Sequence, residues 1–250
     1  MRGLTQEIFW LGMLVEVLAL GSIAYASGIL ATKYGVKVNY TRKINHFAIF
    51  FLPVFIADAF PFDPTLSTIL VNAGIFALAL ALLTKPVRTR SGVLGTIFAS
   101  FDRPEDRPHT LLWLSTQVAA GYAVLIPLAY VLYLADAPGL VYVPILINGI
   151  GDGLAEPIGV RFGRHTYQVS ALFSERTYSR SWEGSAAVFA VSVLVVIFFR
   201  DQFTPVQFWA ALAAVPIAMT LAEARAPHTW DTPFLFLVGG AVPLAIVSWL

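Results

Sequence analysis

Residues 7–31 read EIFWLGMLVEVLALGSIAYASGILA, an apolar run whose interior contains a single charged residue, Glu16. This length matches the roughly 20 residues that a helix needs to cross the hydrocarbon core of a bilayer. Of the 250 residues in the chain, 58% are hydrophobic and only 12% are charged, and the mean hydropathy is +0.74. A soluble domain of this size could not bury so much apolar side chain. The sequence therefore predicts an integral membrane protein.

Further apolar runs of similar length follow along the chain, each bounded by polar or charged residues. They cover residues 44–60, 67–84, 110–134, 141–160, 183–199, 206–222 and 233–250. Because helices satisfy their own backbone hydrogen bonds in lipid, we expect an all-α fold, a polytopic transmembrane helical bundle of about eight helices. No connection is long enough to fold alone, so we expect a single integral-membrane domain over residues 1–250.

The basic residues are concentrated in alternate connections between these runs. Of the 16 Lys and Arg residues, 14 lie in four segments, residues 32–43, 85–109, 161–182 and 223–232. Cytoplasmic loops of membrane proteins carry such an excess of positive charge. The pattern therefore predicts that these four segments are cytoplasmic and that both termini are outside. It is typical of a bacterial inner membrane or an organellar membrane alike.

The run 141–160 departs from the apolar rule. Asn148, Asp152 and Glu156 recur at every fourth residue, which places them on one face of a helix, among several glycines. Packing can explain the glycines, but two carboxylates one turn apart repel each other unless a positive group lies between them. Oxygen ligands of this kind suit Mg²⁺, which completes its shell with phosphates and water. The stripe therefore predicts a metal site at Asp152 and Glu156.

The segment 161–182 and the residues after it suit an anion. Arg161, Arg164 and Arg180 provide guanidinium groups that bind phosphate oxygens, and Ser181 and Gly184 stand where the next helix begins. The segment could instead contact anionic lipid headgroups. Beside a stripe that suits a metal, a nucleoside triphosphate site is the favoured interpretation.

These residues together resemble a known family. Asp152-x-x-Ala155-x-x-x-Gly159-x-x-x-Gly163, followed by Arg180-Ser181-x-Glu183-Gly184-Ser185, is similar to the CTP-binding signature of the dolichol kinase and phytol kinase family, which are polytopic lipid kinases. Arg42-Lys43-x-x-His46 resembles an element near the start of these proteins. Glu223, with His228-Thr229-Trp230-Asp231-Thr232-Pro233, resembles their C-terminal region. The resemblance thus covers most of the chain.

The resemblance implies a CTP-dependent kinase that phosphorylates the hydroxyl of a membrane lipid alcohol, such as a polyprenol or phytol, at the cytoplasmic interface. It implies Mg²⁺ as cofactor, CTP and the lipid as partners, and no nucleic acid. The nucleotide-binding residues that it implies are Arg42, Lys43, Asn148, Gly159, Arg161, Gly163, Arg164, Arg180, Ser181, Glu183, Gly184 and Ser185. Asp152 and Glu156 are the expected metal ligands, and Asp152, Asp231 and His46 are the catalytic candidates, with Asp231 and His46 as alternative proton acceptors.

Two alternatives remain open. Arg180-Ser181-Trp182-Glu183-Gly184 also resembles a motif of the phosphatidate cytidylyltransferases, which use CTP and Mg²⁺ as well, although their second signature is absent here. Carboxylates within a membrane also mark ion-coupled transporters, but these are often built from inverted repeats, and the sequence contains no repeat. The departures from the kinase pattern include Arg180, where the family usually has lysine, and Thr232, where it often has asparagine.

Overall fold

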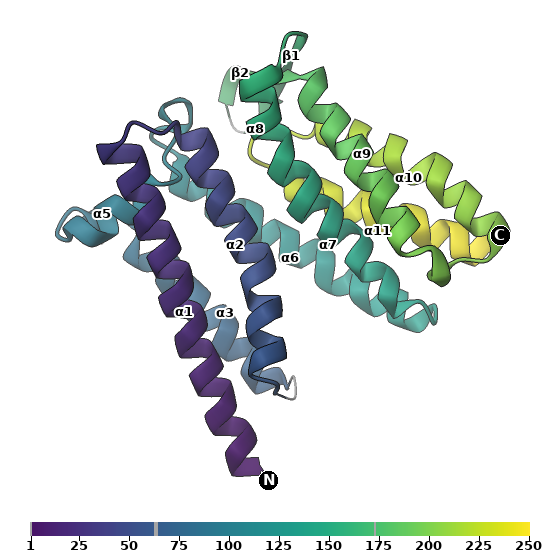
Figure 1. Ribbon diagram of the computed structural model, residues 1–250, viewed down its shortest axis with the longest axis horizontal. Helices are drawn as coiled ribbons and strands as arrows, with labels where there is room; N and C mark the ends of the chain where they lie inside the picture. The colour runs from purple at the N-terminus through teal and green to yellow at the C-terminus, as the bar shows by residue number, and fades with distance from the viewer. Residues whose placement is uncertain (1, 63–64, 173) are drawn as a thin grey trace. The chain divides into compact units, whose positions relative to one another are not determined.

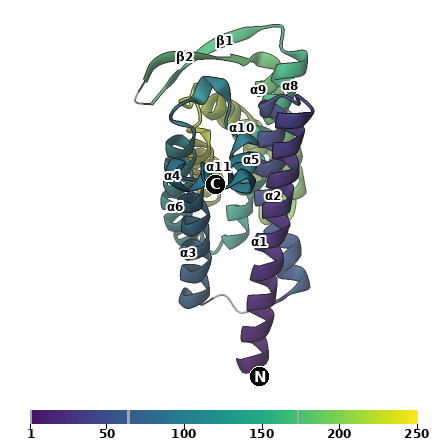
Figure 2. The same cartoon turned by 90° about the vertical axis from the view of Figure 1, so that its left-hand side faces the viewer.

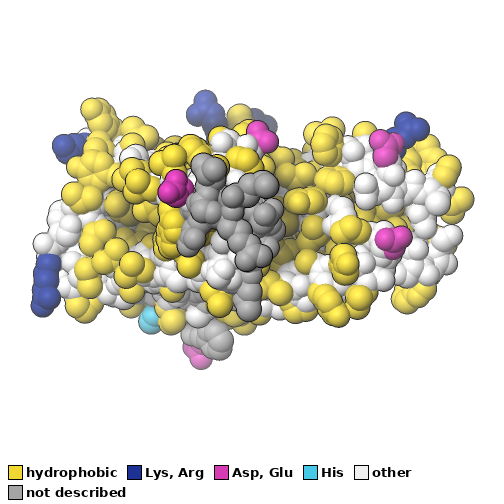
Figure 3. Space-filling view, turned by 90° about the horizontal axis from the view of Figure 1, so that it is seen from below, with side chains coloured by type: hydrophobic (Ala, Val, Ile, Leu, Met, Phe, Trp, Pro, Cys, Tyr) yellow, Lys and Arg dark blue, Asp and Glu magenta, His cyan; other side chains and the backbone are white. Residues whose placement is uncertain are grey.

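The computed structural model describes residues 2–62, 65–172 and 174–250, and almost all of its regular structure is helical. The chain divides into two compact units, an N-terminal unit up to Leu111 and a C-terminal unit from Leu112 onward (Figure 1). Hydrophobic side chains cover much of the face seen in Figure 3, and few charged side chains interrupt them. An apolar surface of this kind is stable against lipid rather than water. The predicted all-α membrane fold is confirmed.

The N-terminal unit consists of helices joined by short connections. They are α1 (Arg2–Lys33), α2 (Val38–Ala59), α3 (Leu66–Leu82), α4 (Lys85–Arg88) and α5 (Gly92–Ala99), followed by the turn η1 (Pro104–Asp106). Helix α1 packs against α2 and α5. A Cβ atom at Gly28 would lie 1.9 Å from the carbonyl oxygen of Thr96, so glycine permits this close approach of α1 and α5. Thr41 and Asn45 of α2 each donate a hydrogen bond of 2.7 Å to the fully buried Ser100.

The C-terminal unit begins within the long helix α6 (Thr110–Leu134) and continues through further helices. The elements are η2 (Pro138–Val141), α7 (Tyr142–Leu146), η3 (Ile147–Asp152), α8 (Gly153–Phe162), α9 (Trp182–Phe198), η4 (Arg200–Gln202), α10 (Pro205–Arg225) and α11 (Asp231–Trp249). Helix α9 packs against α8 and α10, and α10 against α11 (Figure 1). The side chains of Leu132, Ile147, Val188, Met219 and Leu235 are fully buried between these helices. Their burial forms the apolar core of this unit.

The segment predicted as a basic loop over residues 161–182 is instead an antiparallel β-hairpin, apart from residue 173, which lies outside the described residues. Strand β1 (Thr166–Ala171) pairs with β2 (Ser174–Ser181). Figure 2 shows the hairpin across the ends of the helices of its own unit. Burial alternates along the second half of β1, where Val169 and Ala171 are buried and their neighbours exposed. The alternation explains the strand, because one face of the hairpin packs on protein while the other stays open.

The predicted spans agree with the helices within a few residues. Among the described residues, five segments are long and apolar enough to cross a membrane, namely Glu7–Lys33, Thr110–Leu134, Pro138–Phe162, Pro205–Arg225 and Asp231–Trp249, with Ser67–Leu82 and Trp182–Phe198 as shorter apolar helices. The protein is therefore a multi-pass membrane protein. The count of about eight spans, the orientation of the termini and the single domain stay predictions.

The other predicted loops are shorter than expected. The segment 32–43 is reduced to the connection between Lys33 and Val38, and 223–232 to the connection between Arg225 and Asp231. The segment 85–109, predicted as a loop, contains the helices α4 and α5. The charged residues at both ends of the segment favoured the loop prediction.

Candidate functional site around Arg180

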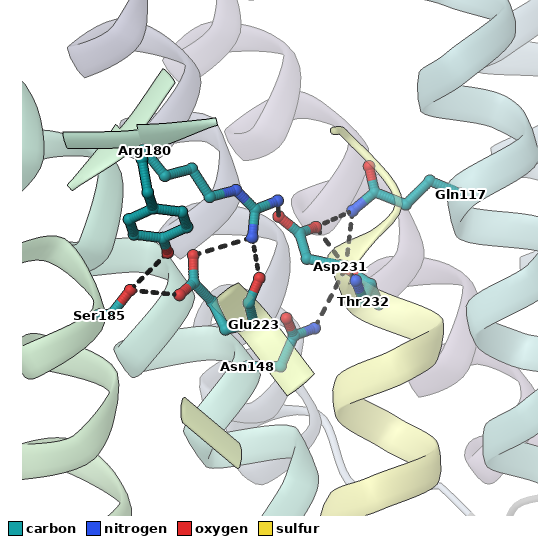
Figure 4. Close-up of polar contacts among 8 residues, drawn as sticks. Gln117, Asn148, Arg180, Ser185, Glu223, Asp231 and Thr232 are labelled. Carbon is teal, nitrogen blue, oxygen red and sulfur yellow. Dashed lines mark hydrogen bonds and ion pairs between the residues drawn. The ribbon is translucent and has the colours of Figure 1, made fainter. Parts of the chain in front are cut away.

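Arg180 is the centre of a buried ionic cluster in the C-terminal unit. It lies near the end of β2, and only 13% of its side chain is exposed. Its guanidinium donates hydrogen bonds to both the backbone carbonyl and the carboxylate of Glu223, the latter at 3.0 Å, and lies 3.6 Å from the carboxylate of Asp231 (Figure 4). One guanidinium therefore joins the end of α10, the start of α11 and the hairpin.

Three carboxylates surround the guanidinium of Arg180. Burial by itself lowers the pKa of Arg180, but the carboxylates of Glu223, Asp231 and Asp152 raise it, so the net shift is upward and the guanidinium stays charged. Arg180 is therefore the positive centre of a cluster of acidic side chains.

A chain of hydroxyl groups connects Glu223 to the hairpin. Ser185, in the first turn of α9, donates to Glu223 at 2.9 Å, and its oxygen lies 2.7 Å from the hydroxyl of Tyr167. Because the proton of Ser185 is directed to the carboxylate, Tyr167 must donate to Ser185. Burial and the charge of Glu223 raise the pKa of Tyr167, which keeps this phenol protonated. The hydroxyl groups of Ser185 and Tyr167 therefore link the carboxylate of Glu223 to β1.

A second group of contacts holds Asp231 from the other side. Gln117 of α6 donates to the carboxylate of Asp231 at 3.0 Å and to the hydroxyl of Thr232 at 2.7 Å. Asn148 donates to the same hydroxyl at 3.4 Å (Figure 4). The elements α6 and η3, which are far apart in the sequence, therefore both contact the start of α11.

The stripe that drew attention in the sequence lies partly on a π-helix. Asn148 and Asp152 belong to η3, where the backbone is wound more widely than an α-helix, and Glu156 follows on α8. Asn148 is fully buried and Asp152 is 5% exposed, whereas Glu156 is half-buried. Short π-helical turns occur frequently at functional sites because they redirect side chains from a helix. Asp152 is thereby brought within electrostatic range of Arg180.

The spacing of Gly159, Gly163 and Gly184 serves close packing around Ser181. Ser181 caps α9 by accepting a hydrogen bond of 3.1 Å from the backbone of Gly184. A Cβ atom at Gly159 would lie 2.8 Å from the hydroxyl of Ser181, and one at Gly163 would lie 2.9 Å from its Cβ. A Cβ atom at Gly184 would lie 2.7 Å from the carbonyl of Ala155. These glycines let the ends of α8 and α9 approach each other, and their contact with a nucleotide stays a prediction.

The hairpin is fixed to the connection between α10 and α11 by aromatic stacking and backbone contacts. The rings of Tyr178 and His228 stack with centroids 3.6 Å apart, and the ring of Trp113 contacts both at their edges. The backbone of His228 donates to Ser170 at 2.8 Å. This small apolar cluster holds β2, and hence Arg180, over the carboxylates.

The next residue in this connection, Thr229, is strained. Its φ is 65°, in the left-handed region that a β-branched side chain rarely adopts. It is 7% exposed, and its hydroxyl, like the indole nitrogen of Trp230, has no hydrogen-bond partner among the described residues. Strain of this kind persists where surrounding contacts fix the backbone. Thr229 lies in such a place, because it directly precedes Trp230 and the start of α11.

We expect Thr229→Gly to stabilise the protein by about 1–2 kcal/mol, because it relieves backbone strain and removes an unpaired hydroxyl, against the smaller entropic cost of glycine. Thermal unfolding in detergent measures the change. Thr229→Val is the matched control, since it removes the hydroxyl but keeps the β-branched side chain in the strained conformation. Equal stability of the two variants would show that the backbone of Thr229 stores no strain.

The remaining predicted site residues lie on other elements. Arg161 and Arg164 are exposed at and after the end of α8. The half-buried Glu183 contacts His165, with 2.9 Å between its carboxylate and the imidazole. Arg42, Lys43 and His46 lie on α2, in the N-terminal unit. Their predicted roles in binding and catalysis stay predictions.

The donor set around Arg180 suits a metal only in combination with a ligand. Among the described residues, no three His, Asp or Glu side chains lie close enough to hold a metal ion by themselves. Mg²⁺ differs from most metals in this respect, since one or two carboxylates suffice when substrate phosphates complete its shell. The carboxylates of Asp152 and Glu156, one helical turn apart, therefore fit a Mg²⁺ ion that arrives with a phosphate ligand.

Several members of the cluster were not expected from the sequence. Glu223 entered only as part of a resemblance, and Thr232 only as a departure from it. Tyr167 and Gln117 carried no prediction at all. For Gln117 a signal was present, because an uncharged amide within a span is costly unless it finds a partner. For Tyr167 there was none, because its role depends on the hairpin.

Comparison with known proteins adds one related protein. The chain is similar to the phytol kinase of Synechocystis sp. (strain ATCC 27184 / PCC 6803 / Kazusa), with 30% identity over 105 residues. The aligned part covers 42% of this chain and 41% of that kinase, so the chain spans less than half of its length. The similarity supports a relation to the phytol kinases. No family model matches the chain, and no solved structure matches it.

Proposed function

We propose that this protein is a CTP-dependent kinase that phosphorylates the hydroxyl of an isoprenoid alcohol at the cytoplasmic face of a membrane. The observation that carries the proposal is the buried cluster of Arg180 with Glu223, Asp231 and Asp152, at the end of apolar helices. Phosphoryl transfer depends mainly on positioning and on stabilising negative charge, which such a cluster supplies. The similarity to a phytol kinase supports the same chemistry.

The residues divide into those for the phosphates and those for the alcohol. Arg180 binds oxygens of the transferred phosphate, exchanging part of its contact with the carboxylates for the ligand. Asp152 and Glu156 hold Mg²⁺, which neutralises charge on the phosphates when it is bound. Arg161 and Arg164, exposed near the end of α8, bind the remaining phosphates of CTP.

Asp231 is the proposed proton acceptor. Its carboxylate lies at the start of α11, where the side chain of Gln117 and the backbone of Thr232 each donate an N–H to it. The oxygen of the lipid alcohol forms a bond to the γ-phosphorus of CTP, the bond from that phosphorus to the β–γ bridging oxygen breaks, and CDP leaves. The proton of the alcohol passes to Asp231. His46 remains the alternative acceptor.

The test is transfer of label from CTP to a lipid by the purified protein in detergent or vesicles. With phytol or geranylgeraniol and CTP labelled on the γ-phosphate, we expect a labelled lipid monophosphate that requires Mg²⁺. The same reaction with α-labelled CTP should leave the lipid unlabelled. Transfer of α-label to phosphatidate, with release of pyrophosphate, would instead identify a cytidylyltransferase. Absence of any transfer, together with solute flux into vesicles, would favour a transporter.

A further inference from the structure

Gln117 stands apart from the other residues of the cluster because it comes from an otherwise apolar helix. It lies on α6, whose sequence from Thr110 to Leu134 contains no charged residue and no other carboxamide. An amide in such a helix is costly in lipid unless its hydrogen bonds are made within the protein. Gln117 makes them to the start of α11, with Asp231 and Thr232 (Figure 4).

The contacts fix which end of the amide faces α11. The carboxylate of Asp231 can only accept hydrogen bonds, so the nitrogen of Gln117 must face it, since the amide oxygen would be repelled. One N–H is directed to Oδ1 of Asp231 at 3.0 Å, and the other to the hydroxyl of Thr232 at 2.7 Å. Both protons of the amide are therefore used on neighbouring residues of one helical turn.

The two carboxylate oxygens of Asp231 therefore have different partners. Oδ1 accepts from Gln117 and from the backbone N–H of Thr232, each at 3.0 Å. Oδ2 faces the guanidinium of Arg180 at 3.6 Å, which is longer than a direct hydrogen bond. With Oδ1 held, rotation of the carboxylate is restricted, and Oδ2 is kept toward the centre of the cluster.

We propose that Gln117 is a positioning residue, which holds the carboxylate of Asp231 in the orientation that accepts the proton of the lipid alcohol. The inference rests on the proposed function for its catalytic part. A base that is free to rotate spends less time in the reactive geometry, and small losses of orientation lower the rate strongly. The contact with Thr232 serves the same end, because it fixes the amide plane.

The kinetic test replaces Gln117 with methionine, which has a similar shape and no N–H donor. We expect kcat to fall about 10–100-fold, while KM for CTP stays within about two-fold, because Asp231 acts on the alcohol rather than on the nucleotide. The kcat of Gln117→Glu should be lower still, since this substitution places a second carboxylate beside Asp231. The matched control is Thr116→Val, which removes a hydroxyl that bonds only within α6, to Leu112 and Trp113, and should leave kcat unchanged.

A second measurement does not depend on activity. Gln117→Met should lower Tm by about 2–4 °C in the wild-type background, and this loss should become smaller when Asp231 is already alanine, because only the bond to Thr232 then remains to be lost. Wild-type kcat in Gln117→Met, or the same loss of Tm in both backgrounds, would overturn the proposal. If the wild-type protein transfers no phosphate from CTP, the proposed kinase falls, while the Tm comparison still decides whether Gln117 holds Asp231.

Discussion

Arg180→Met should destabilise the protein by about 3–5 kcal/mol and abolish its activity. Removal of one partner from a buried ionic group leaves the others without compensation. Here Glu223 and Asp231 would lose their guanidinium partner in a site where Arg180 is only 13% exposed, with Asp152 in electrostatic range. The hairpin would also lose the contact that joins it to α10. Thermal unfolding in detergent and the labelled-CTP assay measure the two effects.

Two further variants make this prediction specific. Arg180→Lys keeps the charge but cannot reach both Glu223 and Asp231 with a planar fork, so we expect an intermediate loss. Glu223→Gln in the Arg180→Met background should recover part of the stability, because it removes one uncompensated charge. Arg176→Met, at an exposed position of the same strand, serves as control and should change stability by about 0.5 kcal/mol or less. Equal stability of Arg176→Met and Arg180→Met would contradict the account of the cluster.

The helical architecture could be predicted because lipid imposes a simple rule on the sequence. A segment such as residues 110–134 must be apolar and long enough to cross, and it forms one continuous helix despite Pro127. The hairpin could not be predicted in the same way. Its buried face depends on contacts of Tyr178 with His228 and Trp113, which are far apart in the sequence. The alternation of apolar and polar residues in β1 is also too short to indicate a strand, because the segment has only six residues.

In the candidate site too, some features could be predicted from the sequence and others could not. Asp152 could be found because a carboxylate within a span, four residues after an asparagine, contradicts the apolar pattern. The π-helical turn around it could not, because the wider winding depends on how η3 packs against α9. The grouping of Arg180 with Glu223 and Asp231 needs the hairpin in place. Local sequence patterns therefore identified individual charged residues, while the partners of these residues could be identified only from the tertiary structure.

Asp152→Asn should lower kcat/KM by about 10²-fold or more while the protein stays folded. Asparagine keeps the shape of the side chain but removes the charge that the proposed Mg²⁺ ligand needs, and even the indirect partners of metal ligands contribute about 10–100-fold. Folding should survive because Arg180 retains its contacts with Glu223 and Asp231. Arg180 thus keeps two carboxylate partners when Asp152 loses its charge, so no unpaired cation is left in the cluster.

Stability measurements with and without ligand separate this role from a purely structural one. Mg²⁺ with CTP should raise the Tm of the wild-type protein, since a ligand that binds only the folded state stabilises it. Asp152→Asn should lose most of that increase while keeping the Tm of the ligand-free protein. Asp201→Asn, an exposed carboxylate in η4, should behave as the wild type. An unchanged response to Mg²⁺ and CTP in Asp152→Asn, with near-normal turnover, would exclude Asp152 as the metal ligand and leave its charge to the orientation of Arg180.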